Sequence, residues 1–80
     1  MKTHGGPFQA AGVPDILGCW NGLFVGIELK VPGEEPTKLQ QEVLDLLHLA
    51  GAHVGVATTV DEAISIRDGL NDYKMFRNRG

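Results

Sequence analysis

The chain is poor in the features that define several classes of protein. Its single cysteine, Cys19, cannot form a disulfide within the chain, and this favours a reducing, intracellular and therefore cytoplasmic setting. No apolar run approaches the roughly 18 residues that a membrane-spanning helix needs, and no charged, apolar and small-residue pattern marks a signal peptide. We therefore expect a protein without a membrane partner.

An excess of basic charge is also absent. The 80 residues carry a formal net charge of -3, which argues mildly against a purely electrostatic nucleic-acid binder. Residues 73–80 nevertheless hold Lys74, Arg77 and Arg79 and no acid, so this tail either contacts phosphates or is a solvated chain end. A chain of this length makes one small domain, which we expect to span residues 1–72 and to precede a basic tail.

Periodic patterns predict six elements. Asn21 and Gly22 lie between two apolar segments and predict a tight hairpin. The predicted elements are strands over residues 1–4, 15–20, 23–31 and 53–58, and helices over residues 38–50 and 59–72. The helix between the third and fourth strands is long enough for a parallel crossover. We therefore expect an α/β (α+β) fold with a mixed sheet, flanking helices and the order βββαβα.

Both predicted helices carry start signals. Thr37 and Gln40 form a capping box before the first helix, and Thr59 and Glu62 form the same pattern before the second. Within the first helix a single apolar stripe is expected, because its apolar residues are spaced at helical intervals. This stripe consists of Leu39, Val43, Leu46, Leu47 and Ala50.

The hairpin brings charged side chains together. If the turn is centred on Asn21 and Gly22, opposed residues have numbers that sum to 43, so Asp15 lies opposite Glu28. Lys30 lies two residues after Glu28 and projects from the same face. The opposite face would be core, and Cys19 is interpreted as a small buried strand residue. The expected core residues are Ile16, Val25, Ile27, Leu29 and Val31.

Two opposed carboxylates destabilise a hairpin unless a cation lies between them. Mg²⁺ takes oxygen ligands, often one or two carboxylates with substrate phosphate, and an ammonium group beside it can hold an attacking water. The arrangement therefore fits a metal-dependent phosphoryl-transfer site. The pattern alone fits a simpler explanation better: Glu28 and Lys30 alternate with apolar residues as in any half-exposed strand, and Asp15 after Pro14 fits ordinary turn chemistry.

Several motifs together resemble the VRR-Nuc family of the PD-(D/E)XK nuclease superfamily. They are "GVPDIL", "GIELK", "PTKLQ" at the start of a helix, and "AGAHVGVATTVDEA". The resemblance covers roughly residues 2–70. It implies a restriction-endonuclease-like core that cuts DNA phosphodiester bonds with Mg²⁺ or Mn²⁺.

The resemblance also implies roles for individual residues. Asp15, Glu28 and the backbone carbonyl of Leu29 would be metal ligands, and Lys30 would be the catalytic lysine. Gln40 matches the family's glutamine on the following helix, although its capping role explains it equally well. Lys2, His4 and Lys38 would contact DNA.

Stand-alone members of the family resemble Holliday junction resolvases, some of them phage-encoded, and act as dimers on branched DNA. This chain resembles them, but we expect it to lack the usual N-terminal helix and its acid before the first strand. We therefore expect either an endodeoxyribonuclease or a catalytically impaired DNA-binding or interaction module. We also expect a homodimer whose interface includes some of the apolar residues without evident cover. These are Trp20, Phe24, Leu44 and Leu49.

Overall fold

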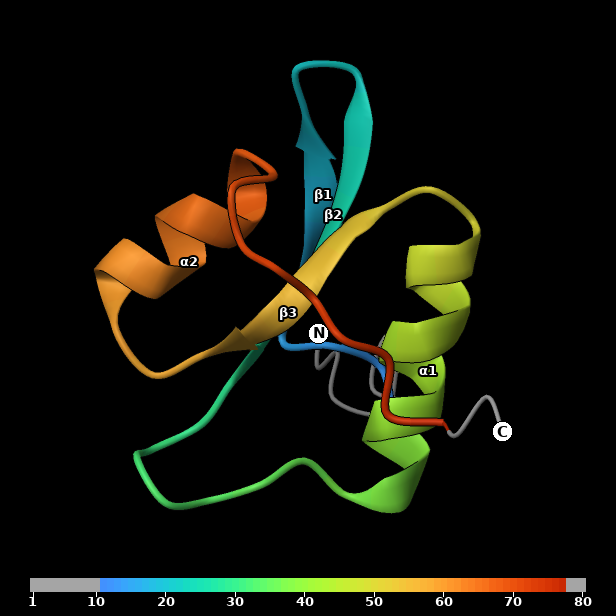
Figure 1. Ribbon diagram of the computed structural model, residues 1–80, viewed down its shortest axis with the longest axis vertical. Coiled ribbons are helices and arrows are strands. Elements are labelled where there is room, and N and C mark those ends of the chain that lie inside the picture. Colours follow the sequence, from blue (N-terminus) through green and yellow to red (C-terminus); the bar gives the residue numbers. More distant parts are fainter. Residues whose placement is uncertain (1–10, 78–80) are drawn as a thin grey trace, which may run out of the picture.

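A mixed three-stranded sheet lies between two helices (Figure 1). The computed structural model of the chain describes residues 11–77, so the strand predicted over residues 1–4 lies outside them. The described elements are β1 (Ile16–Trp20), β2 (Leu23–Leu29), α1 (Lys38–Leu49), β3 (His53–Ala57) and α2 (Val60–Arg67). The α+β class and the order of these five elements agree with the prediction.

The hairpin register is confirmed. β1 pairs antiparallel with β2, with Ile16 opposite Ile27 and Trp20 opposite Leu23, so opposed residue numbers sum to 43. Asn21 and Gly22 both have positive φ, 53° and 82°, as a two-residue primed turn requires. The twist of such a turn matches that of the strands, which is why this dipeptide sets the register.

The predicted parallel crossover is also confirmed. β3 pairs parallel with β2, with Ile27 beside Gly55 and Leu29 beside Ala57, and α1 forms the connection between them. The helices cover opposite faces of the sheet (Figure 1). On the α2 face Gly55 allows close packing, because an added Cβ would lie 2.8 Å from Ile66 Cδ1.

The second helix is shorter than predicted. α2 ends at Arg67 rather than near Asp72, because Gly69 adopts a left-handed conformation with φ of 75°. The amide of Leu70 then donates to the carbonyl of Ser65 at 2.8 Å. This pattern closes a helix end with a C-terminal glycine, and the remaining residues cross the sheet instead of extending the helix.

The predicted core face is only half correct. Val25 and Ile27 are buried against Ala57 and Ile66, whereas Leu29 is 48% and Val31 64% exposed. Ile16 is also exposed, because the helices pack mainly against β2 and β3 and leave β1 uncovered. Val31 follows the end of β2, where no neighbouring strand continues among the described residues. Cys19 is exposed as well, contrary to the prediction.

The buried face of α1 differs from the predicted stripe. Leu44 is fully buried and packs with Val54, so its assignment to an uncovered surface is wrong. Leu39 and Leu46 of the predicted stripe are exposed. A stripe drawn from apolar residues alone also leaves out Asp45, which is only 1% exposed.

Asp45 holds the end of the described chain against α1. Its Oδ1 accepts hydrogen bonds from the Tyr73 hydroxyl at 2.6 Å and the Phe76 amide at 2.9 Å, and its Oδ2 accepts from the Arg77 amide at 2.8 Å. Residues 70–77, here called the strap, therefore cross β3 and reach α1 (Figure 1). Asn71 within the strap donates to the Val54 carbonyl at 3.0 Å and so covers the outer edge of β3.

Burial alone raises the pKa of Asp45, but the hydrogen bonds from Tyr73, Phe76 and Arg77 outweigh it and lower the pKa below its usual value. The ionised form is therefore favoured in the folded state. The resulting stabilisation is present at neutral pH and is lost as the pH falls through the folded-state pKa.

Asp45→Asn should lower the free energy of unfolding at neutral pH by about 1.5–3 kcal/mol, the usual contribution of hydrogen bonds to a charged group. Tyr73→Phe removes only one of the three donors and should cost less. Denaturant unfolding at pH 7 and near pH 3 measures both effects, and the difference between Asp45→Asn and the unmodified protein should shrink at the lower pH. Equal destabilisation at both pH values would contradict a contribution from the ionised form of Asp45.

Candidate metal centre

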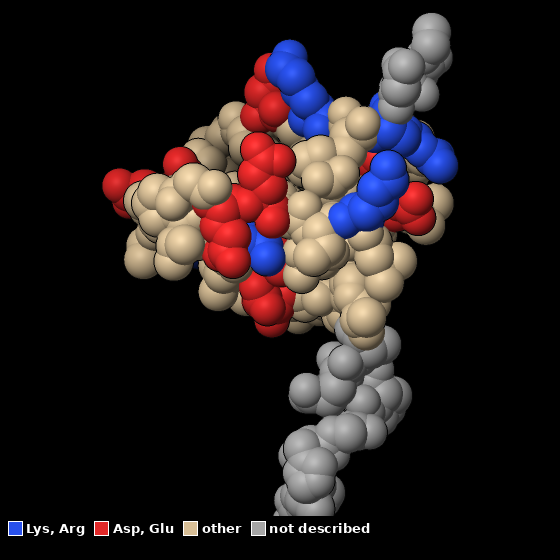
Figure 2. Space-filling model, turned by 90° about the horizontal axis from the view of Figure 1, so that it is seen from below, with Lys and Arg blue, Asp and Glu red and all other residues tan. Residues whose placement is uncertain are grey.

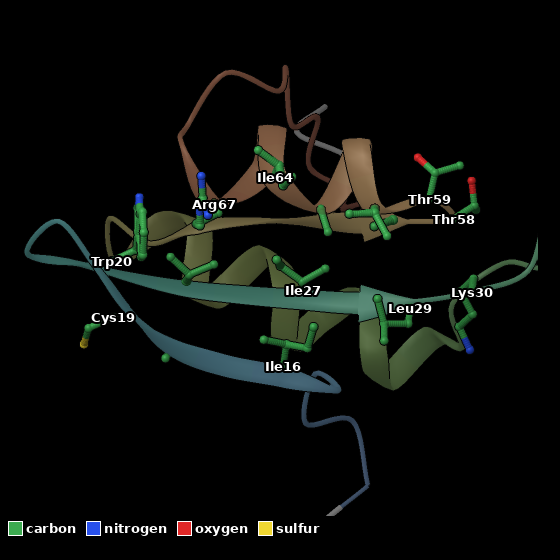
Figure 3. Close-up of a pocket in the computed structure, with 15 residues that line it drawn as sticks. Ile16, Cys19, Trp20, Ile27, Leu29, Lys30, Thr58, Thr59, Ile64 and Arg67 are labelled. Atoms are coloured by element: carbon green, nitrogen blue, oxygen red, sulfur yellow. The ribbon is translucent and has the colours of Figure 1, made fainter.

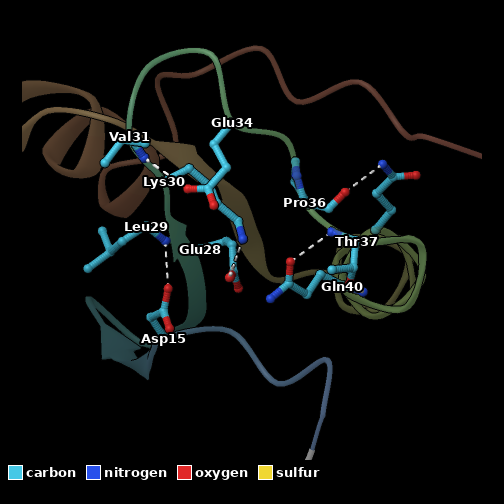
Figure 4. A network of polar contacts seen from close by, with 10 residues as sticks. Asp15, Glu28, Leu29, Lys30, Val31, Glu34, Pro36, Thr37 and Gln40 are labelled. Atoms are coloured by element: carbon cyan, nitrogen blue, oxygen red, sulfur yellow. Dashed lines mark hydrogen bonds and ion pairs between the residues drawn. The ribbon is translucent and has the colours of Figure 1, made fainter.

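The predicted acidic site forms where β1 begins and β2 ends (Figure 4). Asp15 immediately precedes β1, and its Oδ2 accepts a hydrogen bond from the backbone amide of Leu29 at 2.9 Å. This bond extends the hairpin by one position and anchors the exposed Asp15 side chain beside the end of β2. Asp15 and Glu28 therefore come together as the register predicts.

Glu28 lies on the face of the sheet that α1 covers and is only 2% exposed. Its Oε1 is buried and has no hydrogen-bond partner among the described residues. A buried polar atom without a partner costs free energy, so this oxygen is the least satisfied group of the site. A cation that prefers oxygen ligands would supply the missing partner, so the Glu28 carboxylate is suited to bind such a cation.

Lys30 is the nearest compensating charge. Its Nζ lies 3.8 Å from Glu28 Oε2, and its side chain is 13% exposed. The main chain of Lys30 is fixed, because its amide donates to the Ala57 carbonyl at 3.0 Å. The ammonium group is thus held beside the carboxylates but remains in contact with solvent, where it can reach a water molecule or a bound anion.

Burial raises the pKa of Glu28 above its usual value, and repulsion from the neighbouring Asp15 carboxylate raises it further. The Lys30 ammonium group acts in the opposite direction and only partly offsets these effects. The ionised Glu28 side chain is therefore disfavoured in the folded protein. A divalent cation would reverse this balance, because it favours the charged carboxylate.

The carbonyl of Leu29 lies on the same side as Asp15. Peptide groups alternate between the two edges of a strand, and the amide of Lys30 points to β3. The amide and carbonyl of Leu29 therefore point to the opposite edge, where Asp15 accepts the Leu29 amide. Two carboxylates and one carbonyl form a ligand set of the kind that Mg²⁺ completes with waters and phosphate.

Gln40 is oriented by the helix start. Its Oε1 accepts from the Thr37 amide at 2.8 Å, and the Gln40 amide donates to Thr37 Oγ1 at 3.1 Å (Figure 4). The predicted capping box is therefore confirmed, while the Gln40 side-chain amide nitrogen is not used by it. At α2 Thr59 caps the helix as predicted, but the Glu62 carboxylate accepts from Thr58 rather than from Thr59.

The residues expected to contact DNA are only partly placed. Lys2 and His4 lie outside the described residues, and Lys38 is exposed at the start of α1. Figure 2 shows that acidic side chains cluster near the centre of one face, with one small basic patch among them and further basic side chains toward the rim. Such a face attracts cations and repels an uncompensated phosphate backbone.

Within residues 11–77 no group of three or more His, Cys, Asp or Glu side chains could enclose a metal ion. The sequence does not indicate that a Glu28 oxygen is buried without a partner, because this burial results only from the packing of α1 against the sheet. The contact of Asp15 with the Leu29 amide was not predicted either. The one available signal for that contact is the position of Asp15, one residue before the paired strand.

Comparisons of the chain with protein-family models, with curated proteins and with solved structures found no match. The resemblance to VRR-Nuc nucleases therefore rests on the sequence motifs alone. The geometry of the site is an independent observation, and it is the observation on which a functional proposal can be built.

Glu28→Gln should remove the pH dependence that the buried carboxyl group causes. The folded-state pKa of Glu28 is raised above its usual value, so the protonated carboxyl group favours the folded state. This contribution to the free energy of unfolding is full at low pH and is lost as the pH rises through the folded-state pKa. In the presence of a chelator, the melting temperature of Glu28→Gln relative to the unmodified protein should therefore increase between about pH 4 and pH 7, a range that begins near the ordinary pKa of glutamate.

Glu42→Gln is the matched control, since Glu42 is exposed on α1. Thermal unfolding of the three proteins over this pH range measures the effect. A difference between Glu28→Gln and the unmodified protein that stays constant with pH would show that Glu28 is not disfavoured in its ionised form.

Proposed function

We propose that the chain is a metal-dependent DNA endonuclease of the VRR-Nuc type. The observation that carries this proposal is the buried, unpartnered oxygen of Glu28 beside Asp15 and within ion-pair distance of Lys30. In this proposal Asp15, Glu28 and the Leu29 carbonyl hold Mg²⁺ or Mn²⁺. The bound metal would act as a Lewis acid on the scissile phosphate and lower the pKa of a bound water.

The remaining chemistry belongs to the protein's own side chains. Lys30 presents its ammonium group beside the carboxylates, where it orients the attacking water or offsets negative charge that develops in the transition state. Asp15 is held by the Leu29 amide, so one of its oxygens is positioned before any ligand binds. Gln40, positioned by its capping bond, leaves its side-chain nitrogen for a phosphate oxygen or a water.

The substrate class follows from the resemblance, which favours branched DNA such as a four-way junction cut by a homodimer. The net charge of -3 argues mildly against DNA binding by bulk electrostatics alone. A divalent metal bound by Asp15 and Glu28 would offset part of the repulsion between the protein and the phosphates. As for membranes, neither helix within residues 11–77 has the length and apolar character of a membrane span.

Millimolar Mg²⁺ or Mn²⁺ should raise the melting temperature of the protein. A free metal concentration about tenfold above Kd stabilises the folded state by about 1.4 kcal/mol, which corresponds to about 6–11 °C for a domain of this size. Asp15→Asn should abolish most of the shift while its amide oxygen still accepts the Leu29 amide.

Asp72→Asn is the control for this experiment, because the Asp72 side chain is 90% exposed and lies 3.7 Å from Lys74 Nζ, away from the candidate metal centre. Scanning calorimetry with NaCl at matched ionic strength separates specific binding from screening. A shift of equal size in the Asp15→Asn and Asp72→Asn proteins would place the metal elsewhere.

Lys30→Ala should lower the single-turnover rate of DNA cleavage at saturating enzyme by about 10²–10³, the effect of losing one preorganised transition-state donor. Metal binding and DNA binding should change little. Lys30→Arg should restore little activity, because a planar guanidinium does not reproduce a compact ammonium donor.

Lys74→Ala is the matched control, since it removes a lysine whose side chain is 82% exposed. A four-way junction with Mg²⁺ is the substrate. If Lys30→Ala cleaves at the unmodified rate, Lys30 contacts phosphate without taking part in catalysis. If the unmodified protein binds the junction without cutting it, the chain is a DNA-binding module rather than an enzyme.

A further inference from the structure

The candidate metal centre has few direct protein ligands. Two carboxylates and one carbonyl leave about half of the six positions around Mg²⁺ to water and substrate, and no third acidic side chain of residues 11–77 completes a cluster with them. Proteins also hold metal ions through groups that contact the metal's own ligands, and loss of such a group weakens metal binding. A further acid within reach of the metal-bound waters would therefore strengthen the centre.

The α2 face of the sheet does not supply such an acid. The groove over this face has a volume of about 720 Å³ and runs between β1, β2 and α2 (Figure 3). Its described lining residues include no carboxylate. On the opposite face Asp45 of α1 already accepts three hydrogen bonds from the strap. The loop over residues 30–37, which connects β2 with α1, also borders the centre and carries two acids, Glu34 and Glu35.

A tight turn brings Glu34 back to the end of β2. Pro32 and Gly33 are the two central residues of this turn, and Gly33 has a φ of 91°, as the third residue of a type II turn requires. The Glu34 amide donates to the Val31 carbonyl at 3.0 Å and closes the turn. The sequence Val-Pro-Gly-Glu therefore fixes the backbone of Glu34 next to the residue that follows Lys30.

The Glu34 carboxylate lies close to the ligands of the candidate centre. Its Oε1 accepts from the Val31 amide at 3.5 Å, while Asp15 accepts from the Leu29 amide at 2.9 Å. These two amides are two residues apart, so at most about 7 Å of chain separates them. The carbonyl of Leu29, the third proposed ligand, lies between the two amides in the chain. Glu34 and Asp15 therefore contact the same short segment.

The Glu34 side chain is available for a second partner. A distance of 3.5 Å is long for a hydrogen bond to a carboxylate, and Glu34 is exposed, so its carboxylate is only weakly held by the Val31 amide. Figure 4 shows the Glu34 side chain extending from the loop toward those of Lys30 and Glu28. The buried Glu28 oxygen without a partner among the described residues is an independent sign that a cation is needed there.

We infer that Glu34 is a third acidic residue of the candidate metal centre and accepts a hydrogen bond from a metal-bound water, an inference that rests on the proposed metal-dependent function. Such a water lies about 2 Å from Mg²⁺ and donates to an acceptor less than about 3 Å further away. A carboxylate that does not touch the ion is therefore still able to hold it, in agreement with the lack of a direct three-acid cluster in the described part of the chain. The negative charge of Glu34 also attracts the cation.

Glu34→Gln should weaken the binding of Mn²⁺ by roughly tenfold, the lower end of the loss that follows removal of a group outside the direct ligands. Mn²⁺ is a suitable probe, because it takes the same carboxylate, carbonyl and water ligands as Mg²⁺. The electron paramagnetic resonance signal of unbound Mn²⁺ measures the bound fraction. The glutamine oxygen still accepts from the Val31 amide, so the melting temperature in a chelator should not change.

Removal of Glu34 acts on the metal either directly or through Lys30, if the carboxylate pairs with that ammonium group and draws it away from Glu28. The substitution Glu34→Gln is therefore repeated in the Lys30→Ala protein. A direct effect on the metal should persist there with the same fold-change in Mn²⁺ affinity, because the two changes are then independent. Loss of the effect in this background would overturn the inference.

Glu35→Gln is the matched control, because Glu35 is the neighbouring exposed acid and its substitution changes the net charge equally. Equal Mn²⁺ affinities of the Glu34→Gln and Glu35→Gln proteins would overturn the role of Glu34 alone. An unmodified protein that binds no Mn²⁺ would overturn this role together with the metal centre. The expected Mn²⁺ affinities without cleavage of a four-way junction would support the role of Glu34 and contradict only the nuclease proposal.

Discussion

The two-residue turn at Asn21 and Gly22 is the constraint on which the position of every charged group in the site depends. Side chains alternate between the faces of a strand, so a slip of one residue would move Glu28 from the α1 face to the α2 face and separate it from Asp15. The positive φ angles of both turn residues specify a tight connection. That local preference therefore decides a non-local contact between residues 15 and 28.

Features that depend on neighbouring residues could be predicted from the sequence. The turn, the hairpin register, the Thr37 cap and the parallel connection through α1 all follow from local patterns, and the structure confirms each of them. The position of Asp15 opposite Glu28 followed from the register, because opposed residue numbers in the hairpin sum to 43. These are the parts of the fold in which the local preference and the final structure agree.

Features that depend on packing between distant segments could not be predicted in this way. Nothing local distinguishes Asp45 from an exposed helical acid, because its three donors lie 28 to 32 residues later in the chain. The exposure of Leu29 also depends on packing, since Leu29 lies beside Ala57 at the end of the sheet where α2 begins. α2 ends at Arg67 because Gly69 adopts a left-handed conformation, and the chain then turns back over the sheet as the strap.

Asp45 and Glu28 show two opposite outcomes of burying a carboxylate in a small domain. Asp45 accepts three hydrogen bonds, and its ionised form is favoured. Glu28 has an oxygen without a partner among the described residues and a like charge beside it, and its ionised form is disfavoured. A domain of this size has little free energy of unfolding to lose, and an uncharged side chain at Glu28 would avoid the cost. The unsatisfied oxygen is therefore the physical reason to propose a ligand at this position. Its place next to Asp15 and Lys30 favours a cation as that ligand, with access to an anionic substrate.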